Sequence, residues 1–314
     1  MKKWFIAILS LIFLFFIIAY FIIPGQIFVT RSFTSNANQT GVYRYLTHQS
    51  NWQKWWPANG SGKTRTDTLL EEAGFSFHIN KILYNAFDIS ISKGKNTDSS
   101  VLYIFSPVKD SIKVEWNTTI NTGTNPFSKI SRYFKARELN KSLGEILRAM
   151  QTHIGNVKNI YGIDIRKEKV KTEFLVSTTK TFDHYPGTGE IYEIIGLIKK
   201  HISNERVKEE DYPMLNIKNQ DSQHYEAQVA IPVDKKLPDT DSFSIKRMLK
   251  MGDILVAEIT GGKNSVDNAM KLVNMYASDH QYNNIAIPFH SLVTDRMKEP
   301  DSTKWVTKIY YPIM

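Results

Sequence analysis

The 314-residue chain contains no cysteine. Disulfide bonds, cysteine-ligated zinc, iron–sulfur clusters and thiol catalysis are therefore excluded. The absence of cysteine does not determine the redox compartment, because such a chain suits either side of a membrane.

Recognisable catalytic and metal-binding motifs are also missing. The eight histidines form neither H-E-x-x-H nor a pair four residues apart, and no acidic cluster completes a metal site. No G-x-S-x-G nucleophile elbow occurs. Residues 59–64 (NGSGKT) end like a phosphate-binding loop, but Pro57 stands where that motif needs its first glycine. The sequence predicts no catalytic residue, no metal and no cofactor.

The chain is basic, with a formal charge of +9, and 42% of its residues are hydrophobic. That composition is typical of a globular protein, and the length favours about two domains. A basic protein associates with lipid headgroups or with nucleic acid. The basic residues are spread along the chain without a helix-turn-helix segment, so we expect no nucleic-acid partner and relate the charge to an anionic lipid surface. Protein partners cannot be predicted.

A long apolar run opens the chain. Residues 4–23 are apolar except for Ser10 and Tyr20, and a helix of about 20 residues crosses the hydrocarbon core of a bilayer. The alternative is a cleaved secretory signal, whose apolar part reaches about 15 residues and ends in a small-x-small site. This run is longer and ends in FIIPG at 21–25, without such a site. We therefore expect residues 1–25 to form a transmembrane anchor.

The charges around this run predict its orientation. Lys2 and Lys3 precede it, and the next charged residue is Arg31. Because the positive end of a spanning helix stays in the cytoplasm, the amino terminus is expected inside and everything after Pro24 outside. No second run of this length follows, so the sequence predicts a single-pass membrane protein.

Residues 26–162 predict a helix-on-sheet domain. A strand at 26–35 and a short helix lead into the tryptophan-rich segment 52–57, and residues 75–116 alternate as an antiparallel meander does. Pro126-Phe127 breaks this pattern. From Ala136 onward, one apolar stripe recurs at helical spacing. Its members are Leu139, Leu143, Ile146, Leu147, Met150, Ile154 and Val157.

An internal repeat follows a charged connector at 163–171. Two units, about 172–234 and 245–314, share the order strand, helix, strand, strand. The expected elements are the strands 173–182 and 253–259, the helices 188–203 and 265–279, and the final strands 225–233 and 305–313. Pro232 and Pro312 close equivalent strands. Neither unit buries both its faces alone, so residues 172–314 predict one pseudo-symmetric domain and the whole chain an α+β fold.

The first domain resembles the polyketide-cyclase/START-like (SRPBCC) superfamily. The resemblance rests on the opening strand, the motif Trp52-x-x-Trp55-Trp56-Pro57, the meander and the closing helix around 139–143 (LNKSL). It implies a helix-grip fold with a cavity between the long helix and the curved sheet. Many members bind lipids or other apolar molecules.

The second domain is similar to the gyrase-inhibitor-like effector-binding domain that is fused to bacterial AraC-type transcription activators. The duplicated unit and the final strand around 309–313 (IYYPI) carry this match. The resemblance implies a groove between the units that binds small, often cationic or aromatic molecules. An acidic residue usually stands four positions before the final proline. Here that position is Lys308, and its counterpart is Gln228. A lysine repels a cation, which disfavours the usual ligand class and any hydrolysis that needs the acid.

Three tryptophans are candidates for the first binding site. Trp52, Trp55 and Trp56 offer large flat surfaces with one donor each, suited to the mouth of an apolar cavity. The alternative is that they only seal the end of a small helix against the sheet.

The candidates for the second site are five residues on its final strands. Glu226 and Gln228 share a face of one strand. Trp305, Lys308 and Tyr310 lie on the other, where Trp305 and Tyr310 are an odd number of positions apart and cannot both face the groove. Core or edge packing is the alternative for each residue. If Lys308 does line the groove, anionic or neutral ligands should bind better than cations.

These features predict a membrane-anchored protein that binds a small apolar or amphipathic ligand for sensing, sequestration or transfer. It would stand on the outer face of a bacterial cytoplasmic membrane. The alternative is a hydrolase or cyclase acting in the cavity or the groove, which the missing acid disfavours. Direct transcriptional control conflicts with the expected topology, because a domain outside the membrane does not reach DNA.

Overall fold

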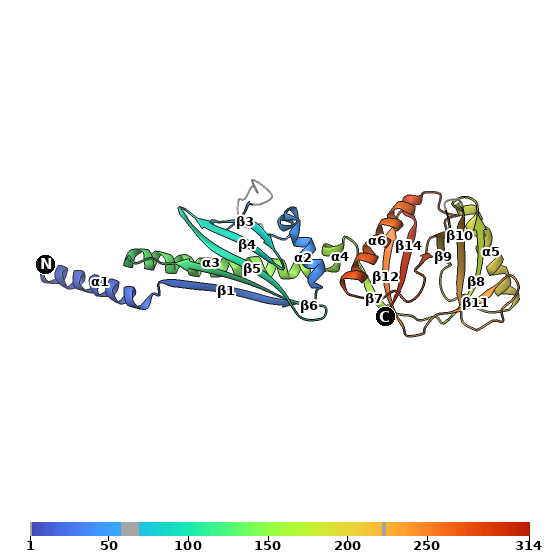
Figure 1. The fold of residues 1–314 in the computed structure, drawn as a ribbon, viewed down its shortest axis with the longest axis horizontal. Coiled ribbons are helices and arrows are strands. Elements are labelled where there is room, and N and C mark those ends of the chain that lie inside the picture. The colour runs from blue at the N-terminus through green and yellow to red at the C-terminus, as the bar shows by residue number, and fades with distance from the viewer. Residues whose placement is uncertain (1, 58–68, 222–223) are drawn as a thin grey trace. The chain divides into compact units, whose positions relative to one another are not determined.

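The computed structural model describes residues 2–57, 69–221 and 224–314, and the chain divides into two compact units, 1–160 and 161–314. The NGSGKT segment at 59–64 lies outside the described residues. Each unit combines helices with one antiparallel sheet, so the predicted α+β fold is confirmed (Figure 1).

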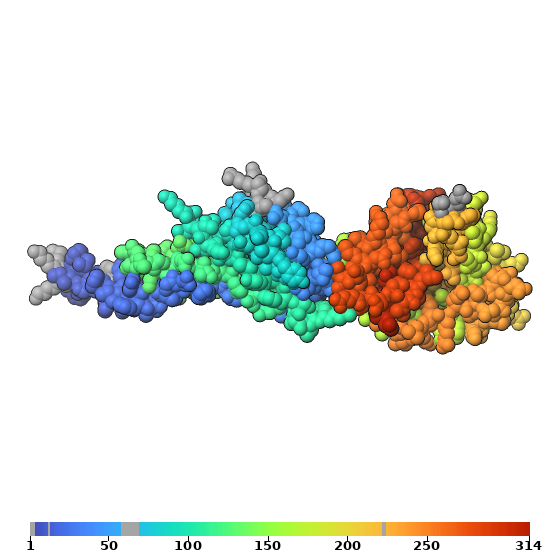
Figure 2. All heavy atoms as spheres, viewed as in Figure 1, coloured from blue at the N-terminus to red at the C-terminus, as the bar shows by residue number. Residues whose placement is uncertain are grey.

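Helix α1 (Lys2–Ile22) comes first. Within the part of the chain that is described, it is the one helix long and apolar enough to cross a membrane, a test that a signal sequence also passes. The first turns of α3 (Pro126–Ile154) lie beside it (Figures 1 and 2). The rings of Phe16 and Phe127 are 4.3 Å apart, and Lys129 Nζ donates to the carbonyls of Tyr20 and Ile23 at 2.9 Å. A cation on these last carbonyls stabilises the end of α1.

The first unit is a sheet of six strands that curls around one face of α3 (Figure 1). The strands run in the order β1-β6-β5-β4-β3-β2. Their bounds are β1 (Gln26–Ser35), β2 (Leu69–Glu72), β3 (Phe75–Leu83), β4 (Ala86–Lys93), β5 (Asn96–Val108) and β6 (Ser111–Asn121). Short helices complete the unit: α2 (Gln39–Thr47), η1 (Gln49–Lys54) and α4 (Val157–Tyr161). The strand predicted at 26–35 matches β1.

The long helix begins ten residues earlier than the expected start at Ala136. Pro126 stands in its first turn, where its missing N–H costs nothing, and the Asn125 side chain accepts from the N–H of Phe127. The early turns are fixed to the sheet by charge. Asp98, 4% exposed, accepts from Lys135 Nζ at 2.7 Å and Arg132 Nη1 at 3.1 Å. An apolar stripe therefore does not mark this half of the helix.

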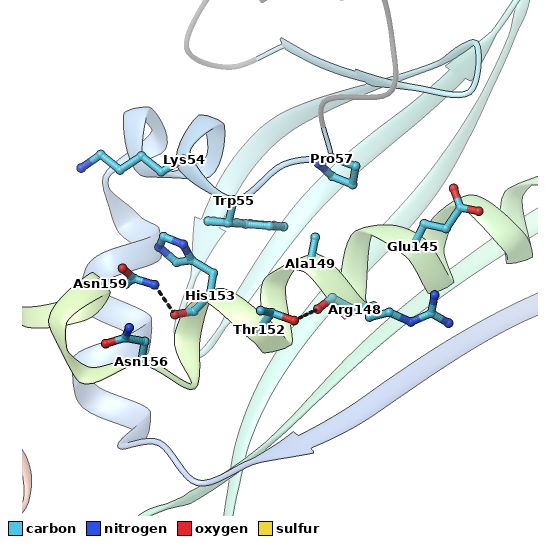
Figure 3. Close-up of a pocket in the computed structure, with 10 residues that line it drawn as sticks. All are labelled: Lys54, Trp55, Pro57, Glu145, Arg148, Ala149, Thr152, His153, Asn156 and Asn159. Atoms are coloured by element: carbon cyan, nitrogen blue, oxygen red, sulfur yellow. Dashed lines mark hydrogen bonds between the residues drawn. The ribbon is translucent and has the colours of Figure 1, made fainter.

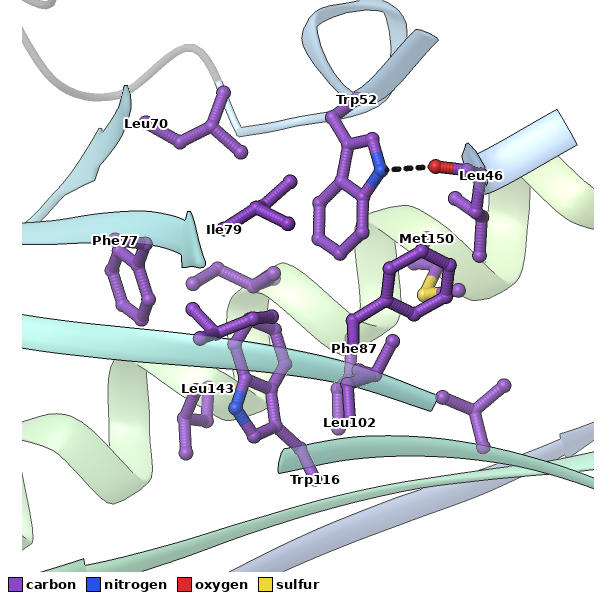
Figure 4. Packing of buried hydrophobic residues seen from close by; sticks show 14 of the residues in the cluster. Leu46, Trp52, Leu70, Phe77, Ile79, Phe87, Leu102, Trp116, Leu143 and Met150 are labelled. Atoms are coloured by element: carbon purple, nitrogen blue, oxygen red, sulfur yellow. Dashed lines mark hydrogen bonds between the residues drawn. The ribbon is translucent and has the colours of Figure 1, made fainter. Parts of the chain in front are cut away.

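Large side chains fill the space between α3 and the sheet (Figure 4). Trp52, Trp116 and Phe87 are all 0% exposed. The indole N–H groups of these two tryptophans are satisfied, since Trp52 donates to the Leu46 carbonyl at 2.8 Å and Trp116 to Ser100 Oγ at 3.0 Å. This interior is packed with aromatic rings.

The second unit is a single sheet of eight strands with a palindromic order, β11-β8-β10-β9-β13-β14-β12-β7. The strands are β7 (Arg166–Lys169), β8 (Phe174–Phe182), β9 (Met214–Asn219), β10 (Tyr225–Val233), β11 (Ser244–Arg247), β12 (Asp253–Thr260), β13 (Phe289–Leu292) and β14 (Val306–Ile313). Helices α5 (Thr188–Asn204) and α6 (Lys263–Asp279) each follow the first strand of a repeat, and η2 (Ser302–Lys304) precedes β14. The order reads alike from either edge, as an internal repeat requires.

The two edge strands were not expected. β7 lies in the connector at 163–171 and pairs with β12, whereas β11 begins at the end of the inter-repeat link and pairs with β8. Their sequences, RKEK and SIKR, are mostly charged or polar, as suits an exposed sheet edge.

The helices bury one face of the second sheet. The predicted inward side chains of α5, at 191, 194, 195, 198 and 202, are all buried. In α6, Val266 and Val273 are buried as predicted, whereas Met270 and Tyr276 are only half-buried, and Ala269 and Ala277 take their place in the core. Among the described residues of this unit, no helix covers the opposite face of the sheet.

Candidate ligand-binding groove

Strand register decides which side chains reach the helix-free face. Along β10, Val229 and Ile231 belong to the core beneath α5, so Gln228, Ala230 and Pro232 point the other way. Along β14, Ile309 is fully buried, and Lys308, Tyr310 and Pro312 alternate with it. The three residues on β10 and the three on β14 occupy equivalent positions in the two repeats.

A groove of about 570 Å³ lies on this face. Its volume falls within the range of roughly 300–1,000 Å³ that is usual for small-molecule sites. We call it the open-face groove. Its lining residues are Val170, Leu175, Met214, Leu215, Asn216, Gln228, Ala230, Lys246, Arg247, Met248, Leu249, Gly252, Asp253, Ile285, Ala286, Ile287, Phe289 and Pro312.

Met248 and Phe289 join the two halves of the groove. Both pack against a cluster on β12 that contains Ile254 and against a cluster on β8 and β10 that contains Ala230. Met248 comes from the segment between β11 and β12, where its N–H donates to the Glu173 carbonyl at 2.8 Å. A flexible thioether beside an aromatic ring adapts to ligands of different shape.

Apolar side chains also stand exposed around the groove. Leu249 is 71% exposed, Ile287 59% and Ile285 45%. Leaving such side chains in water is unfavourable, by about 25 cal/mol for each Å² of apolar surface. Their cluster beside one groove marks a binding surface.

Few polar groups reach the groove. Gln228 Nε2 donates to Ser177 Oγ at 3.2 Å, and Asn216 Nδ2 donates to the Pro288 carbonyl at 2.8 Å. Both carboxamides are thereby held in fixed orientations. Each has an oxygen for which the described residues supply no donor, so a ligand hydroxyl or amide could donate there.

The charges of the groove leave it cationic. Asp253 is neutralised by Lys169 Nζ at 2.6 Å and Lys167 Nζ at 2.9 Å, and hydrogen bonds from these two lysines lower its pKa. Arg247 pairs with Glu173 at 2.6 Å. Lys246 has no ion-pair partner among the described residues. The unbalanced charge is therefore positive.

The predicted site residues of the second domain do not all line one site. Gln228 lines the groove. Glu226 lies on the same face of β10 and accepts from Gln220 Nε2 at 2.6 Å. Lys308 pairs across to β12, where its Nζ is 3.9 Å from Glu258, and its side chain is 30% exposed. Neither Glu226 nor Lys308 lines the groove.

Tyr310 lies beside the groove and supports one of its lining residues without lining the groove itself. Its ring stacks on that of Phe289 with centroids 5.1 Å apart, and Phe289 forms the lining. Burial raises the pKa of Tyr310 to about 12, so the phenol stays neutral over the physiological range.

Trp305 lies elsewhere than expected. It ends η2 and precedes β14 instead of lying within the strand, and its indole donates to the Glu299 carbonyl at 2.7 Å. It lines a different, smaller cavity with Arg296.

The three tryptophans of the first unit have different surroundings. Trp52 is in the core, and Trp56 donates to the Glu71 carbonyl at 3.0 Å while packing on Phe77. Trp55, 5% exposed, lines an open surface depression with Lys54 and His153 (Figure 3). The depression lies at the carboxyl end of α3.

The polar lining of this depression suits it poorly to an apolar ligand. Glu145, Arg148, Thr152, Asn156 and Asn159 all contribute to it (Figure 3). His153 Nε2 lies 2.8 Å from the Tyr45 hydroxyl, and burial together with Lys54 lowers the pKa of His153. The open-face groove is the better candidate site.

Sequence reasoning missed Met248 and Phe289. Met248 lies in a segment without periodicity, and Phe289 begins a strand of only four residues. The available signal was the concentration of apolar residues in two loops, MLKM at 248–251 and IAI at 285–287.

No known family model matches the chain, and no curated protein matches it in sequence. The solved structures to which the chain is similar include three examples. The EcmrR C-terminal domain is 12% identical, covering 48% of this chain and 98% of that one, with a TM-score of 0.41. SAV2435 bound to tetraphenylphosphonium is 15% identical, covering 48% and 94%, with a TM-score of 0.32. The di-domain ARO/CYC protein BexL, from the BE-7585A biosynthetic pathway, is 10% identical, covering 92% and 85%, with a TM-score of 0.33.

Proposed function

We propose that the protein is a membrane-anchored, non-catalytic binding protein for a small apolar or amphipathic molecule, which it holds in the open-face groove. The observation that carries the proposal is the groove itself: about 570 Å³ of space on the helix-free face, lined mainly by apolar side chains. Sensing, sequestration and transfer are all compatible with such a site.

The groove favours a neutral or anionic ligand. Lys246 supplies an unbalanced positive charge, whereas Asp253 is already neutralised by two lysines. A cationic ligand would meet repulsion without an available carboxylate. This agrees with Lys308 standing where the resembled effector domains usually carry an acid.

The chemistry of the lining disfavours catalysis. The described lining residues include no serine, threonine, tyrosine, histidine or glutamate. Their one acid, Asp253, has a lowered pKa and two lysine partners, which make it a poor general base. A hydrolase or cyclase is the alternative, and it would need a nucleophile or base from outside this groove.

The contacts of α1 support the anchoring role. Phe127 packs on Phe16, and α1 ends at Ile22, six residues after Phe16. At 1.5 Å per residue, Phe16 would lie about 9 Å inside the carboxyl end of the span, which is the end next to the folded unit. Phe127 would then enter the outer leaflet, and its ring is 64% exposed. Phe28 and Phe134, 71% and 56% exposed, would add to this membrane surface.

Titration calorimetry on the full chain in lipid nanodiscs tests the groove, with empty nanodiscs as the blank. The probes are naphthalenes that carry a sulfonate, a hydroxymethyl or a trimethylammonium group. We expect the first two to bind more tightly than the third. Ala230→Trp, which fills the groove, should abolish binding, whereas Arg206→Gln at an exposed position of the same unit should not. Equal binding by the wild type and the filled variant would refute the site.

Reporter fusions test the orientation. A phosphatase fused after Met314 should be active, and a reporter that works only in the cytoplasm should be silent there. The reverse result would mean that the carboxyl terminus lies in the cytoplasm, and it would remove the argument against DNA binding.

A further inference from the structure

A second cavity lies on the helix-bearing face of the second unit, where sequence analysis placed no site. It has a volume of about 230 Å³ and takes residues from both repeats. Thr188, at the first turn of α5, and Lys263, at the first turn of α6, both line it. Leu215 and Leu292, from the two central strands, are also in the lining.

Arg296 gives this cavity its charge. Its Nη2 donates to Thr307 Oγ1 at 3.0 Å, and its guanidinium lies 4.6 Å from the centre of the Trp305 ring. The backbone N–H of Arg296 donates to the Tyr192 hydroxyl at 2.7 Å, which fixes the base of the side chain. The guanidinium is thus held rigidly against an aromatic face.

Among the residues that the structure describes, this guanidinium has no acidic partner. Its Nε is buried and has no hydrogen-bond acceptor among the described residues, and no ion pair to Arg296 occurs there. Burial lowers its pKa, and among the described residues the phenols of Tyr192 and Tyr185 oppose this effect. A half-buried cation with a free N–H donor binds an anion well.

The remaining lining adds a second cation and flat surfaces. Lys263 Nζ lies 5.0 Å from the centre of the Tyr185 ring. The described residues that line the cavity include no aspartate or glutamate. Acids close in sequence to its lining are engaged: Asp295, next to Arg296, pairs with Lys298, Asp267 pairs with Lys263, and Glu190 accepts from the Gly187 N–H and contacts His184.

We infer that this cavity is a second ligand site, specific for a small carboxylate with a flat apolar body. The carboxylate would meet the free donors of Arg296, and the body would lie between Trp305, Tyr185 and the leucines of the floor. The volume of about 230 Å³ excludes larger ligands, since drug-sized pockets start at roughly 300 Å³. The site and the open-face groove lie on opposite faces of the sheet, and Leu215 is the one described residue that borders both.

Benzoate is the probe, with benzyl alcohol and benzylamine as its neutral and cationic counterparts. Calorimetry on the full chain in nanodiscs should show benzoate binding more tightly than either. Arg296→Gln should weaken benzoate binding about 10- to 100-fold, because it removes a charge-assisted hydrogen bond. Arg206→Gln, an exposed substitution in the same unit, should leave it unchanged.

Two further variants keep the test decisive. Lys263→Gln should weaken benzoate binding about threefold to tenfold without touching Thr307, so a folding defect of the arginine variant does not spoil the experiment. Ala230→Trp should leave benzoate binding intact even where it abolishes naphthalene binding. Benzoate that binds no better than benzyl alcohol, or whose binding is lost in Ala230→Trp and kept in Arg296→Gln, would overturn the proposal.

Discussion

The two units combine an antiparallel sheet with helices on one face, yet they differ in what covers the sheet. In the first unit the sheet curls around α3, and Trp52, Trp116 and Phe87 fill the enclosed space. In the second, α5 and α6 cover one face, and the other retains a groove lined by smaller side chains such as Ala230. Side-chain volume, more than the order of elements, decides whether such a fold leaves room for a ligand.

The largest effect should follow from emptying the packed interior. Trp116→Ala removes a fully buried indole and its hydrogen bond to Ser100, and we expect it to lower the free energy of unfolding by about 3–5 kcal/mol. Chemical denaturation of the full chain measures this. Tyr84→Ala, at a side chain that is 90% exposed, is the matched control and should change the unfolding free energy by less than about 0.5 kcal/mol. Equal effects would show that the interior is not tightly packed.

Acidification should act in opposite directions through two titratable groups, His290 in the second unit and Glu72 in the first. In the second, burial and the charge of Arg296 lower the pKa of His290 from 6.5 to about 4, and Asp267 partly offsets this. The unfolded chain then binds the extra proton, so this unit loses stability as pH falls from 6.5 to 4, by about 2–3 kcal/mol.

In the first unit, burial and the neighbouring Glu145 raise the pKa of Glu72, which is 2% exposed. Its contribution is therefore complete below pH 4.5 and is lost as pH rises through the raised pKa. Hydrogen exchange, expressed as protection factors corrected for the intrinsic exchange rate at each pH, should show weaker protection of β13 and β14 at pH 5 than at pH 7, and no such loss in β2 and β3. Weaker protection of all four strands at pH 5 would contradict this assignment of the two groups.

The next largest difference between the two units should appear when a small side chain in each is replaced by a large one. Ala136→Trp in the first unit should cost about 1–3 kcal/mol, because no space receives the added ring. Ala230→Trp, in the groove, should change stability by less and remove ligand binding instead. Thermal unfolding of both variants, beside the calorimetry, makes the comparison; a larger loss for Ala230→Trp would mean that the groove is not open.

The smallest effect should come from Lys308→Glu. The side chain is partly exposed, stands near Glu258 and does not line the groove, so we expect the affinity for the trimethylammonium naphthalene to rise by less than about tenfold. A larger rise would place Lys308 in the ligand's direct surroundings. No change for any probe would show that Lys308 acts only at the surface.

Periodicity predicted the parts of the fold that rest on apolar burial. The five isoleucines of α5 and the alternating strand β10 are where the sequence places them. Periodicity did not predict the parts that are held in place by charged side chains. The first turns of α3 are fixed through Lys129 and Lys135, and the edge strand β7 reads RKEK.

The groove was predictable only in part. Gln228 followed from the repeat, because equivalent strands place equivalent residues on one face. Met248 and Phe289 could not be assigned, since their positions depend on how a loop crosses the sheet. Arg296 carries no sequence signal at all: its meaning comes from Trp305 and Thr307, which only the fold brings to it.

Native mass spectrometry of the gently purified full chain tests the central claim most directly, which is that the open-face groove holds a small apolar or amphipathic molecule. The wild type should carry one small molecule per chain, released on activation, and Ala230→Trp should carry none while keeping its fold. A wild-type chain without bound ligand, or an equal ligand load in both proteins, would contradict the account.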